Sequence, residues 1–197
     1  MAQGQIIFLN GTSSSGKTVI AQALQEILSG VYLHFSIDSF LDMLPQHYIS
    51  PEEQEELSPE EGAALAQCIP MLVSGFHHCI GALASRGVNL VVDHVLQDPR
   101  WLRECVEILA DQPVLFVGVH CPLEELERRE SAREREAGTA RQQYEVVHRH
   151  GVYDVEVNTA TNSPLECARQ VKEGLEEMEK TSAFRQLGER LVSEDNF

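Results

Sequence analysis

The stretch from Gly11 to Thr18 constrains the fold of this chain more than any other part of it. It reads GTSSSGKT and matches the pattern G-x-x-x-x-G-K-[ST]. It follows the apolar run Gln5–Asn10 and opens the amphipathic stretch Lys17–Leu28, so a strand precedes the loop and a helix follows it. Glycines let successive N–H groups turn inward, and the helix N-terminus reinforces this anion nest. The pattern predicts a nucleotide-phosphate loop, or P-loop, rather than a Gly/Ser-rich surface turn.

The predicted ligands of this loop are ATP and Mg²⁺. The Lys17 ammonium is placed for the β- and γ-phosphates, and the Thr18 hydroxyl is placed to bind the metal. The full set of predicted phosphate-loop contacts is Gly11, Thr12, Ser13, Ser14, Ser15, Gly16, Lys17 and Thr18.

Short apolar runs alternate with longer amphipathic stretches along most of the chain. This alternation is typical of βαβ units and of a parallel sheet covered by helices on both faces. We expect an α/β fold of the P-loop NTPase type, with a five-stranded parallel sheet in a single domain over residues 1–197. The expected strands are Gln5–Asn10, Val31–Asp38, Val88–Asp93, Val114–Cys121 and Tyr153–Thr159. The expected helices are Lys17–Leu28, Pro59–Ser85, Trp101–Ala110, Leu123–Glu136, Ala140–His148 and Pro164–Lys180.

Three segments depart from this alternation. Pro51–Glu61 carries six glutamates and no basic residue, which predicts a solvated loop. Pro70 lies inside the longest expected helix and predicts a kink or a break into two helices. Thr181–Phe197 is polar with scattered apolar residues, which predicts a loosely docked helix or a partly frayed tail.

The net charge of the chain argues against some classes of binding partner. It has 31 Asp and Glu residues against 15 Lys and Arg, a formal net charge of −16. Such a surface repels nucleic acids and anionic lipids, so neither is an expected partner. No apolar run approaches the roughly 20 residues that span a bilayer, so we do not expect an integral membrane protein. The five cysteines form no CxxC pair, which favours reduced thiols over disulfides or zinc. With no secretory signal pattern, we expect a cytoplasmic protein.

The P-loop alone does not separate kinases from ATPases, GTPases or motor domains. One sheet in 197 residues leaves little room for motor or effector modules, and no Asn/Thr-Lys-x-Asp guanine signature is present. Both observations favour a small kinase. Such an enzyme needs a base for the acceptor hydroxyl, an acid that orients the metal, and a cationic lid over the phosphates.

Aspartates at the ends of two expected strands fit the first two roles. Asp38 ends the second strand, at the sheet edge where open α/β sheets bind ligands, and could accept the proton of an alcohol. It could instead cap the helix that follows, and Asp42 is the rival base. Asp93 ends a strand in the manner of a Walker B acid and could hold Mg²⁺ with Thr18, or bind substrate. His94 beside it is more typical of a packing residue.

An arginine-rich segment fits the third role. Glu124–Arg141 holds six glutamates and five of the 12 arginines, and it can be a surface helix with i,i+4 pairs such as Glu125–Arg129. In a small kinase, a lid at about residues 123–150 would bring guanidinium groups to the transferring phosphoryl group. The candidates are Arg129, Arg133 and Arg135, followed by Arg128 and Arg141.

Several stretches together resemble the chloramphenicol phosphotransferase-like family of P-loop kinases. The resemblance runs in order from about residue 5 to residue 170. It departs from the family pattern at His94, where the family has an acidic residue, and at Asn158, where it has Asp. The stretches that carry it are Ile6–Lys17, Ser36–Phe40, Arg129–Arg133, Val146–His148 and Tyr153–Thr159.

The resemblance implies ATP-dependent phosphate transfer to a primary hydroxyl group, with Asp38 as general base. It also implies Arg133 as the lid arginine, and Thr159 with the following Ala160–Asn162 loop near adenine. We expect a small-molecule O-phosphotransferase with a chloramphenicol-like acceptor. Its expected partners are ATP and a small hydroxyl-bearing substrate. The alternatives are a kinase of another metabolite or nucleoside class, and a nucleotide-binding regulator without catalysis. A homo-oligomer is possible.

Overall fold

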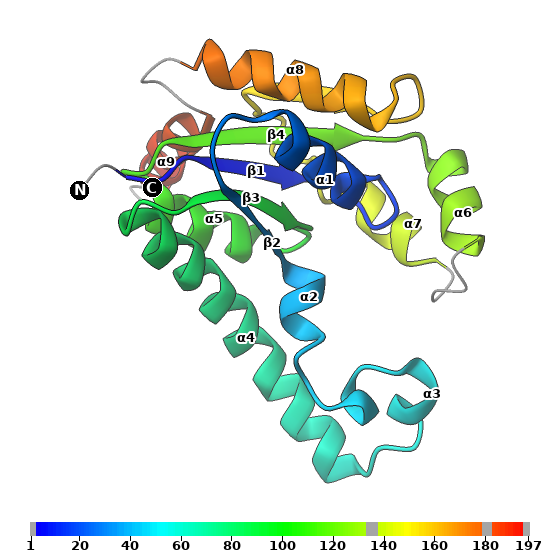
Figure 1. The fold of residues 1–197 in the computed structure, drawn as a ribbon. Helices are drawn as coiled ribbons and strands as arrows, with labels where there is room; N and C mark the ends of the chain where they lie inside the picture. Colours follow the sequence, from blue (N-terminus) through cyan, green and yellow to red (C-terminus); the bar gives the residue numbers. More distant parts are fainter. Residues whose placement is uncertain (1–2, 133–137, 179–182, 195–197) are drawn as a thin grey trace.

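The expected strands pair in parallel in a computed structural model of the chain (Figure 1). The structure describes residues 3–132, 138–178 and 183–194. The sheet order is β2-β3-β1-β4-β5, and all four neighbouring pairs are parallel. This confirms the predicted α/β fold with a five-stranded parallel sheet. The strands are β1 (Ile6–Asn10), β2 (Tyr32–Ser36), β3 (Asn89–His94), β4 (Val114–His120) and β5 (Val155–Asn158).

Helices cover both faces of this sheet (Figure 1). In chain order, the helical elements are α1 (Lys17–Ile27), α2 (Ile37–Leu41), the 3₁₀ helix η1 (Gln46–Tyr48), α3 (Pro51–Gln54), α4 (Pro59–Ser85), α5 (Pro99–Leu109), α6 (Leu123–Ser131), α7 (Thr139–Tyr144), α8 (Pro164–Glu176) and α9 (Ala183–Glu194).

Alternate residues of the central strands build the two cores. Ile7 and Leu9 of β1 point to one face, where Ile20 of α1 and Val171 of α8 pack on them. Phe8 points to the opposite face, which is covered by α4, α5 and α9. All five residues of β1 are fully buried, as expected for the central strand of a parallel sheet covered on both sides.

Pro70 was predicted to kink the helix or to break it in two, and the break does not occur, because helix α4 runs without interruption from Pro59 to Ser85. Pro70 is exposed, and the missing hydrogen bond costs about 3 kcal/mol. Burial of Phe76 and Ile80 anchors the C-terminal half of the helix in the core and offsets this cost.

The acidic segment Pro51–Glu61 is not the predicted continuous loop. It contains α3 and the first turn of α4, where Ser58 and Glu61 form a capping box. The Ser58 hydroxyl accepts from the Glu61 N–H at 3.3 Å, and the Ser58 N–H donates to the Glu61 carboxylate at 3.0 Å. The signal S-x-x-E is present in the sequence at this position, and it marks the start of a helix.

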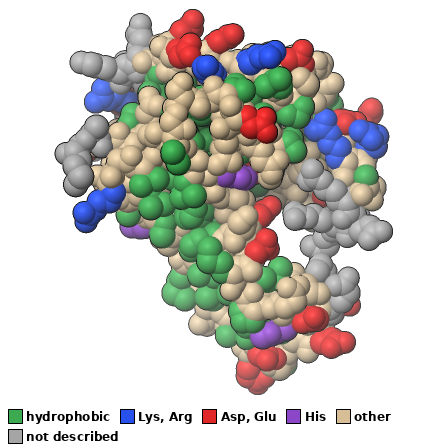
Figure 2. Space-filling model, viewed as in Figure 1, with side chains coloured by type: hydrophobic (Ala, Val, Ile, Leu, Met, Phe, Trp, Pro, Cys, Tyr) green, Lys and Arg blue, Asp and Glu red, His purple; other side chains and the backbone are tan. Residues whose placement is uncertain are grey.

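Helix α4 also corrects the expectation that no apolar stretch approaches membrane-spanning length. By length and composition it could cross a membrane, with a mean hydropathy of 1.3 over its most apolar window. However, Val73, Phe76, Ile80 and Ala84 pack in the core on one face of the sheet, which is the packing of a core helix. Figure 2 shows hydrophobic side chains gathered on the surface over the remainder of the helix.

The C-terminal segment forms a docked helix. Ala183, Phe184 and Leu187 of α9 are buried, and the Phe184 ring lies 4.8 Å from Phe116 in an edge-to-face arrangement. The N-terminus of α9 is held by Asp154, whose carboxylate accepts from the Ala183 N–H at 2.7 Å. The scattered apolar residues Ala183, Phe184 and Leu187 of the predicted tail therefore occupy core positions.

Candidate active site

The P-loop connects β1 to α1 and has the backbone conformation of an anion nest. Gly16 precedes α1 with φ of 93°, and Ser14 has φ of 62°, so both lie in the left-handed region. At Gly11 a Cβ atom would come within 2.5 Å of the Val119 carbonyl oxygen, which explains a glycine there. The Ser14 and Ser15 hydroxyls are buried without a protein partner. Such orphaned donors fit a polyphosphate ligand.

Lys17, Thr18 and Asp93 come together at the start of α1 and the end of β3. The Lys17 ammonium donates to the Thr12 carbonyl oxygen at 2.8 Å and lies 3.7 Å from the Asp93 carboxylate. The Thr18 hydroxyl donates to the other Asp93 oxygen at 2.8 Å. A hydroxyl and a carboxylate in contact are oxygen donors of the kind that Mg²⁺ prefers, so this pair fits the predicted metal site.

The Asp93 carboxylate keeps its charge although it is buried. Burial by itself raises the pKa of this carboxyl group, but the Lys17 ammonium, His34 and the Thr18 hydroxyl together hold the pKa below its usual value. The His34 Nε2 atom lies 3.8 Å from Asp93. An ionised Asp93 is the form that can accept a metal ion.

Asp38 lies in the first turn of α2, not at the end of β2. The expected strand Val31–Asp38 extended two residues too far at its C-terminal end, because Ser36 is the N-cap of α2 and Ile37 turns into the core. The exposed Asp38 carboxylate still faces the predicted place, since it lines the cavity that Lys17, Thr18 and Asp93 also line.

This cavity has a volume of about 520 Å³ and lies beside the P-loop, where Figure 2 shows a hollow between the body of the molecule and the projecting part that contains α3. The far wall comes from α2, η1 and α4. Its apolar residues are Leu41, Leu44, Tyr48, Ile49 and Ile69. Asp42, the rival base, also lines it.

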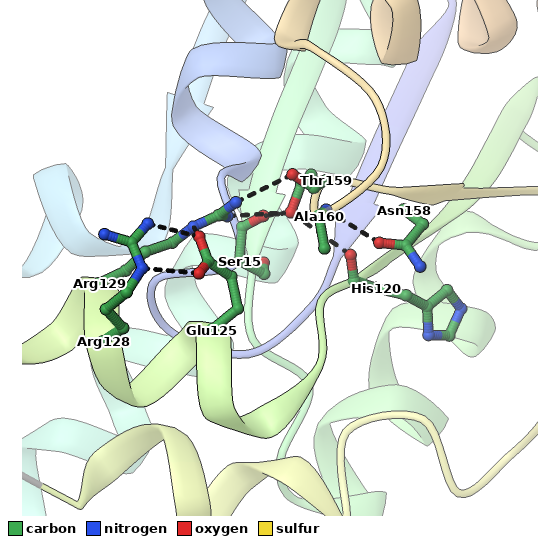
Figure 3. A network of polar contacts seen from close by, with 8 residues as sticks. All are labelled: Ser15, His120, Glu125, Arg128, Arg129, Asn158, Thr159 and Ala160. Atoms are coloured by element: carbon green, nitrogen blue, oxygen red, sulfur yellow. Dashed lines mark hydrogen bonds and ion pairs between the residues drawn. The ribbon is translucent and has the colours of Figure 1, made fainter.

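Arg129 and Thr159 form a bridge between α6 and the P-loop (Figure 3). The Arg129 guanidinium donates to the Thr159 hydroxyl at 3.0 Å and to its carbonyl oxygen at 2.9 Å. The Thr159 hydroxyl in turn donates to the Ser15 carbonyl oxygen at 2.7 Å. Both predicted nucleotide-binding residues therefore lie beside the P-loop, and Gly16 is their immediate neighbour.

Ion pairs hold the candidate lid arginines Arg128 and Arg141 as well as Arg129. Glu125 pairs with Arg129 at 2.7 Å, as predicted, and with Arg128 at 2.7 Å. Hydrogen bonds from Arg128 and then Arg129 lower the pKa of Glu125 to about 2. Arg141 pairs with Glu127. The predicted lid arginines Arg133 and Arg135 lie outside the described residues.

Helix α6 ends earlier than predicted, at Ser131. The Glu130 side chain is nearly fully buried and accepts from the Gly138 and Ala140 N–H groups, each at 2.9 Å. The Glu130 carboxylate therefore binds free N–H groups at the N-terminus of α7 and stabilises the start of that helix. Helix α7 ends at Tyr144, four residues before the predicted end, and residues 145–150 form turns.

Sequence analysis did not select Gln143 or Asn10, although both contact the site. The Ser13 N–H donates to the Gln143 side-chain oxygen at 2.7 Å. The Asn10 amide donates to the Tyr153 hydroxyl at 2.8 Å and to the Val147 carbonyl oxygen at 3.1 Å. Asn10 directly precedes the P-loop, which was its only signal in the sequence, whereas Gln143 lies outside the stretches that carry the family resemblance.

The two departures from the family pattern have structural roles. His94 is buried and packs against His77, with the two Nε2 atoms 2.8 Å apart, so it is a packing residue as expected. The Asn158 side-chain oxygen accepts from the Ala160 N–H at 2.9 Å, which an aspartate oxygen could also do (Figure 3). Over the residues described, no group of three or more His, Cys, Asp and Glu side chains is arranged to hold a metal.

Comparison with known proteins places this geometry in a family. The family model described as "Chloramphenicol phosphotransferase-like protein" matches residues 4–176. The chain belongs to the chloramphenicol phosphotransferase-like family. A relative in Mycobacterium tuberculosis (strain CDC 1551 / Oshkosh), named "Putative O-phosphotransferase MT2714", is 30% identical over 206 residues, covering 98% of this chain and 92% of the relative.

Solved structures of other proteins share the fold of this chloramphenicol phosphotransferase-like protein. The Mycobacterium tuberculosis APS kinase CysC in complex with AMPPNP and APS has a TM-score of 0.64 and 19% identity, covering 89% of this chain and 99% of that chain. The Deinococcus radiodurans tunicamycin resistance protein has a TM-score of 0.61 and 19% identity, covering 88% and 96%. At such identities the likeness shows the P-loop kinase fold alone.

Proposed function

We propose that this protein transfers the γ-phosphate of ATP to a hydroxyl group of a small, chloramphenicol-like molecule. The observation that carries the proposal is a single cavity lined by the P-loop residues Lys17 and Thr18, by Asp93, and by the separate carboxylate of Asp38. Phosphate binding, metal binding and proton acceptance are then available around one space, as phosphoryl transfer requires.

The residues of the site divide the chemistry. The P-loop N–H groups and Lys17 bind the phosphates, and Lys17 offsets negative charge on the transferring group. Thr18 and Asp93 hold Mg²⁺, which neutralises phosphate charge when bound. Asp38 takes the proton of the acceptor hydroxyl group. The acceptor oxygen then bonds to the γ-phosphorus as the bond from that phosphorus to ADP breaks. Arg129 and Thr159, which lie beside Gly16 of the P-loop, would contact the nucleotide.

The wall of the cavity favours an acceptor without negative charge. Among the described lining residues, Lys17 is the only Lys or Arg, and its ammonium is committed to the phosphates. Asp38, Asp42, Asp93 and Glu130 supply negative charge around the same space. Since like charges repel in a shielded cleft, an anionic acceptor would be disfavoured, whereas an uncharged alcohol with an apolar body fits the Leu41, Leu44 and Ile69 wall.

The test is coupled ADP release with Mg·ATP, with and without chloramphenicol, followed by a panel of small alcohols and nucleosides. We expect acceptor-dependent ADP release and a mass gain of one phosphoryl group on the acceptor. Acceptor-dependent release with another alcohol would keep the reaction and replace chloramphenicol. No acceptor-dependent ADP release with any compound of the panel, although ATP binds, would contradict the proposal and favour a nucleotide-binding regulator.

The variant Asp38→Asn tests the assigned base. It should lower kcat by about 10²–10⁴-fold, because general-base catalysis contributes that much, and should leave ATP affinity within about twofold of wild type. Asp42→Asn, one turn away in the same cavity, is the matched control and should retain most of kcat. The opposite pattern would transfer the role of base to Asp42.

A further inference from the structure

Gln143 reaches the P-loop from the segment predicted to be a lid. Its side chain is buried, and its Oε1 atom accepts from the Ser13 N–H at 2.7 Å. Ser13 is the third residue of the P-loop, on the side of the loop that lines the cavity with Asp38. One backbone N–H group of the phosphate loop is therefore hydrogen-bonded to the side chain of Gln143 in α7.

The chemistry of this contact sets the orientation of the amide. A backbone N–H can only donate, so the side-chain oxygen must face Ser13, and the Nε2 group with its two N–H donors faces elsewhere. Gln143 lines the same cavity as Lys17 and Thr18. Its amide nitrogen is therefore a neutral donor at the edge of the space into which the γ-phosphate would extend.

The surrounding contacts fix the position of Gln143 from both sides. On the N-terminal side, the buried Glu130 carboxylate binds the N–H groups of Gly138 and Ala140. On the C-terminal side, Val147 is fully buried, and its carbonyl oxygen accepts from the amide of Asn10, the residue that precedes the P-loop. Contacts on both sides thus hold Gln143 against the P-loop, which suits a ligand-binding group.

We infer that Gln143 binds the γ-phosphate of the nucleotide. Its Nε2 group donates to a γ-phosphoryl oxygen while its Oε1 atom keeps Ser13 in place. The inference rests on the proposed function for the identity of the ligand as ATP. The N–H groups at the start of α1 are the natural partners of the β-phosphate, whereas Gln143 lies on the Asp38 side of the loop, where the transferred group must be.

The test compares the binding of AMPPNP and ADP, measured by calorimetry in the presence of Mg²⁺. Gln143→Glu keeps an oxygen that can accept from Ser13, but it removes the Nε2 donor and adds a negative charge. We expect its Kd for AMPPNP to rise by about tenfold or more, because hydrogen bonds to charged groups are strong, while its Kd for ADP stays within about threefold. Gln143→Met adds no charge but removes both the Nε2 donor and the acceptor for Ser13, so its Kd for AMPPNP should rise more than its Kd for ADP.

Gln142→Glu is the matched control, because it makes the same charge change at the neighbouring, exposed position of α7. It should leave both Kd values unchanged. Equal losses of AMPPNP and ADP binding in the Gln143 variants would overturn the inference and leave Gln143 as a structural support of Ser13. Unchanged binding of both nucleotides would overturn it as well.

Thermal unfolding of each variant without nucleotide shows whether the fold is intact, and a Gln143 variant that fails this check is replaced by the other. The two proposals fail separately. Absence of acceptor-dependent ADP release in the wild-type protein would contradict the proposed function but leave the ratio of AMPPNP to ADP affinity as a test of Gln143.

Discussion

At the scale of single residues, buried polar groups connect the P-loop to distant parts of the chain. Asn10 is fully buried, yet every polar atom of its side chain has a partner: its amide donates to Tyr153 and Val147, and its oxygen accepts from the Leu96 N–H at 2.9 Å. Buried polar groups left unpaired are costly, so these bonds hold three segments at the loop in one arrangement.

His148 in this network makes the stability of the protein depend on pH. Its Nδ1 atom lies 2.7 Å from the Tyr153 hydroxyl, and burial, followed by His120 and His150, lowers the pKa of His148 to about 3. The unfolded histidine titrates near pH 6.5, so the unfolded chain binds more protons between about pH 3 and 6.5. The stability that neutral His148 contributes is therefore complete above about pH 6.5 and is lost as the pH falls through this window.

We predict that His148→Asn, which keeps a hydrogen-bond acceptor but does not titrate, loses about 1–2 kcal/mol less stability than wild type between pH 7 and pH 5. Urea unfolding at a series of pH values measures this difference. His47→Asn, at an exposed position, is the control for the removal of one histidine. Parallel pH profiles for wild type and His148→Asn would contradict the prediction.

At the scale of elements, the loop after β5 joins α6 to the P-loop through one hydroxyl group. The Thr159 hydroxyl accepts a hydrogen bond from the Arg129 guanidinium and donates one to the Ser15 carbonyl oxygen (Figure 3). The contact thus connects the helix that opens the predicted lid to the loop that would bind the phosphates. Its loss should affect both stability and nucleotide affinity.

We predict that Thr159→Val lowers the free energy of unfolding by about 1–2 kcal/mol, because it leaves partly buried polar groups unpaired at constant volume. It should also weaken ATP binding several-fold. Thr161→Val, two residues along in an exposed position, should change neither quantity. Denaturant titration and calorimetry measure the two effects, and a Thr159→Val protein as stable as the control would show that the bridge is dispensable.

At the scale of the whole molecule, the C-terminal helix completes the core on one face of the sheet. Phe184 of α9 lies 5.6 Å from Phe8 of the central strand and 4.8 Å from Phe116 of β4, measured between ring centres. The last helical element therefore covers the strand that carries the P-loop. The segment looks polar in the sequence because only its inward positions are apolar.

We predict that Phe184→Ala lowers the free energy of unfolding by about 3–5 kcal/mol, the usual cost of truncating a buried phenylalanine. The exposed neighbour Gln186→Ala should be within about 0.5 kcal/mol of wild type. Both values follow from denaturant unfolding monitored by circular dichroism. A loss of less than about 1 kcal/mol for Phe184→Ala would mean that α9 contributes little to the fold.

The sequence by itself determined that the chain forms a five-stranded parallel sheet, the order of strands and helices along the chain, and the phosphate loop. These follow from local rules: apolar runs of strand length, helical periodicity, and a glycine pattern between them. Pro70 and the ends of β2 and α6 were predicted less well, because tertiary burial and the buried Glu130 carboxylate overrode local propensity. The acidic segment was predicted as a loop although its local capping signal, Ser58 with Glu61, marks the start of a helix.

Only the tertiary structure decided which side chains share the site. Asp38, Asp93 and Lys17 are far apart in the chain and meet because parallel strands present their carboxyl ends at one edge. Gln143 could not be found from spacing, since its contact with Ser13 spans 130 residues and depends on how the lid segment packs. Local patterns specify elements, whereas contacts between distant residues exist only after the chain has folded.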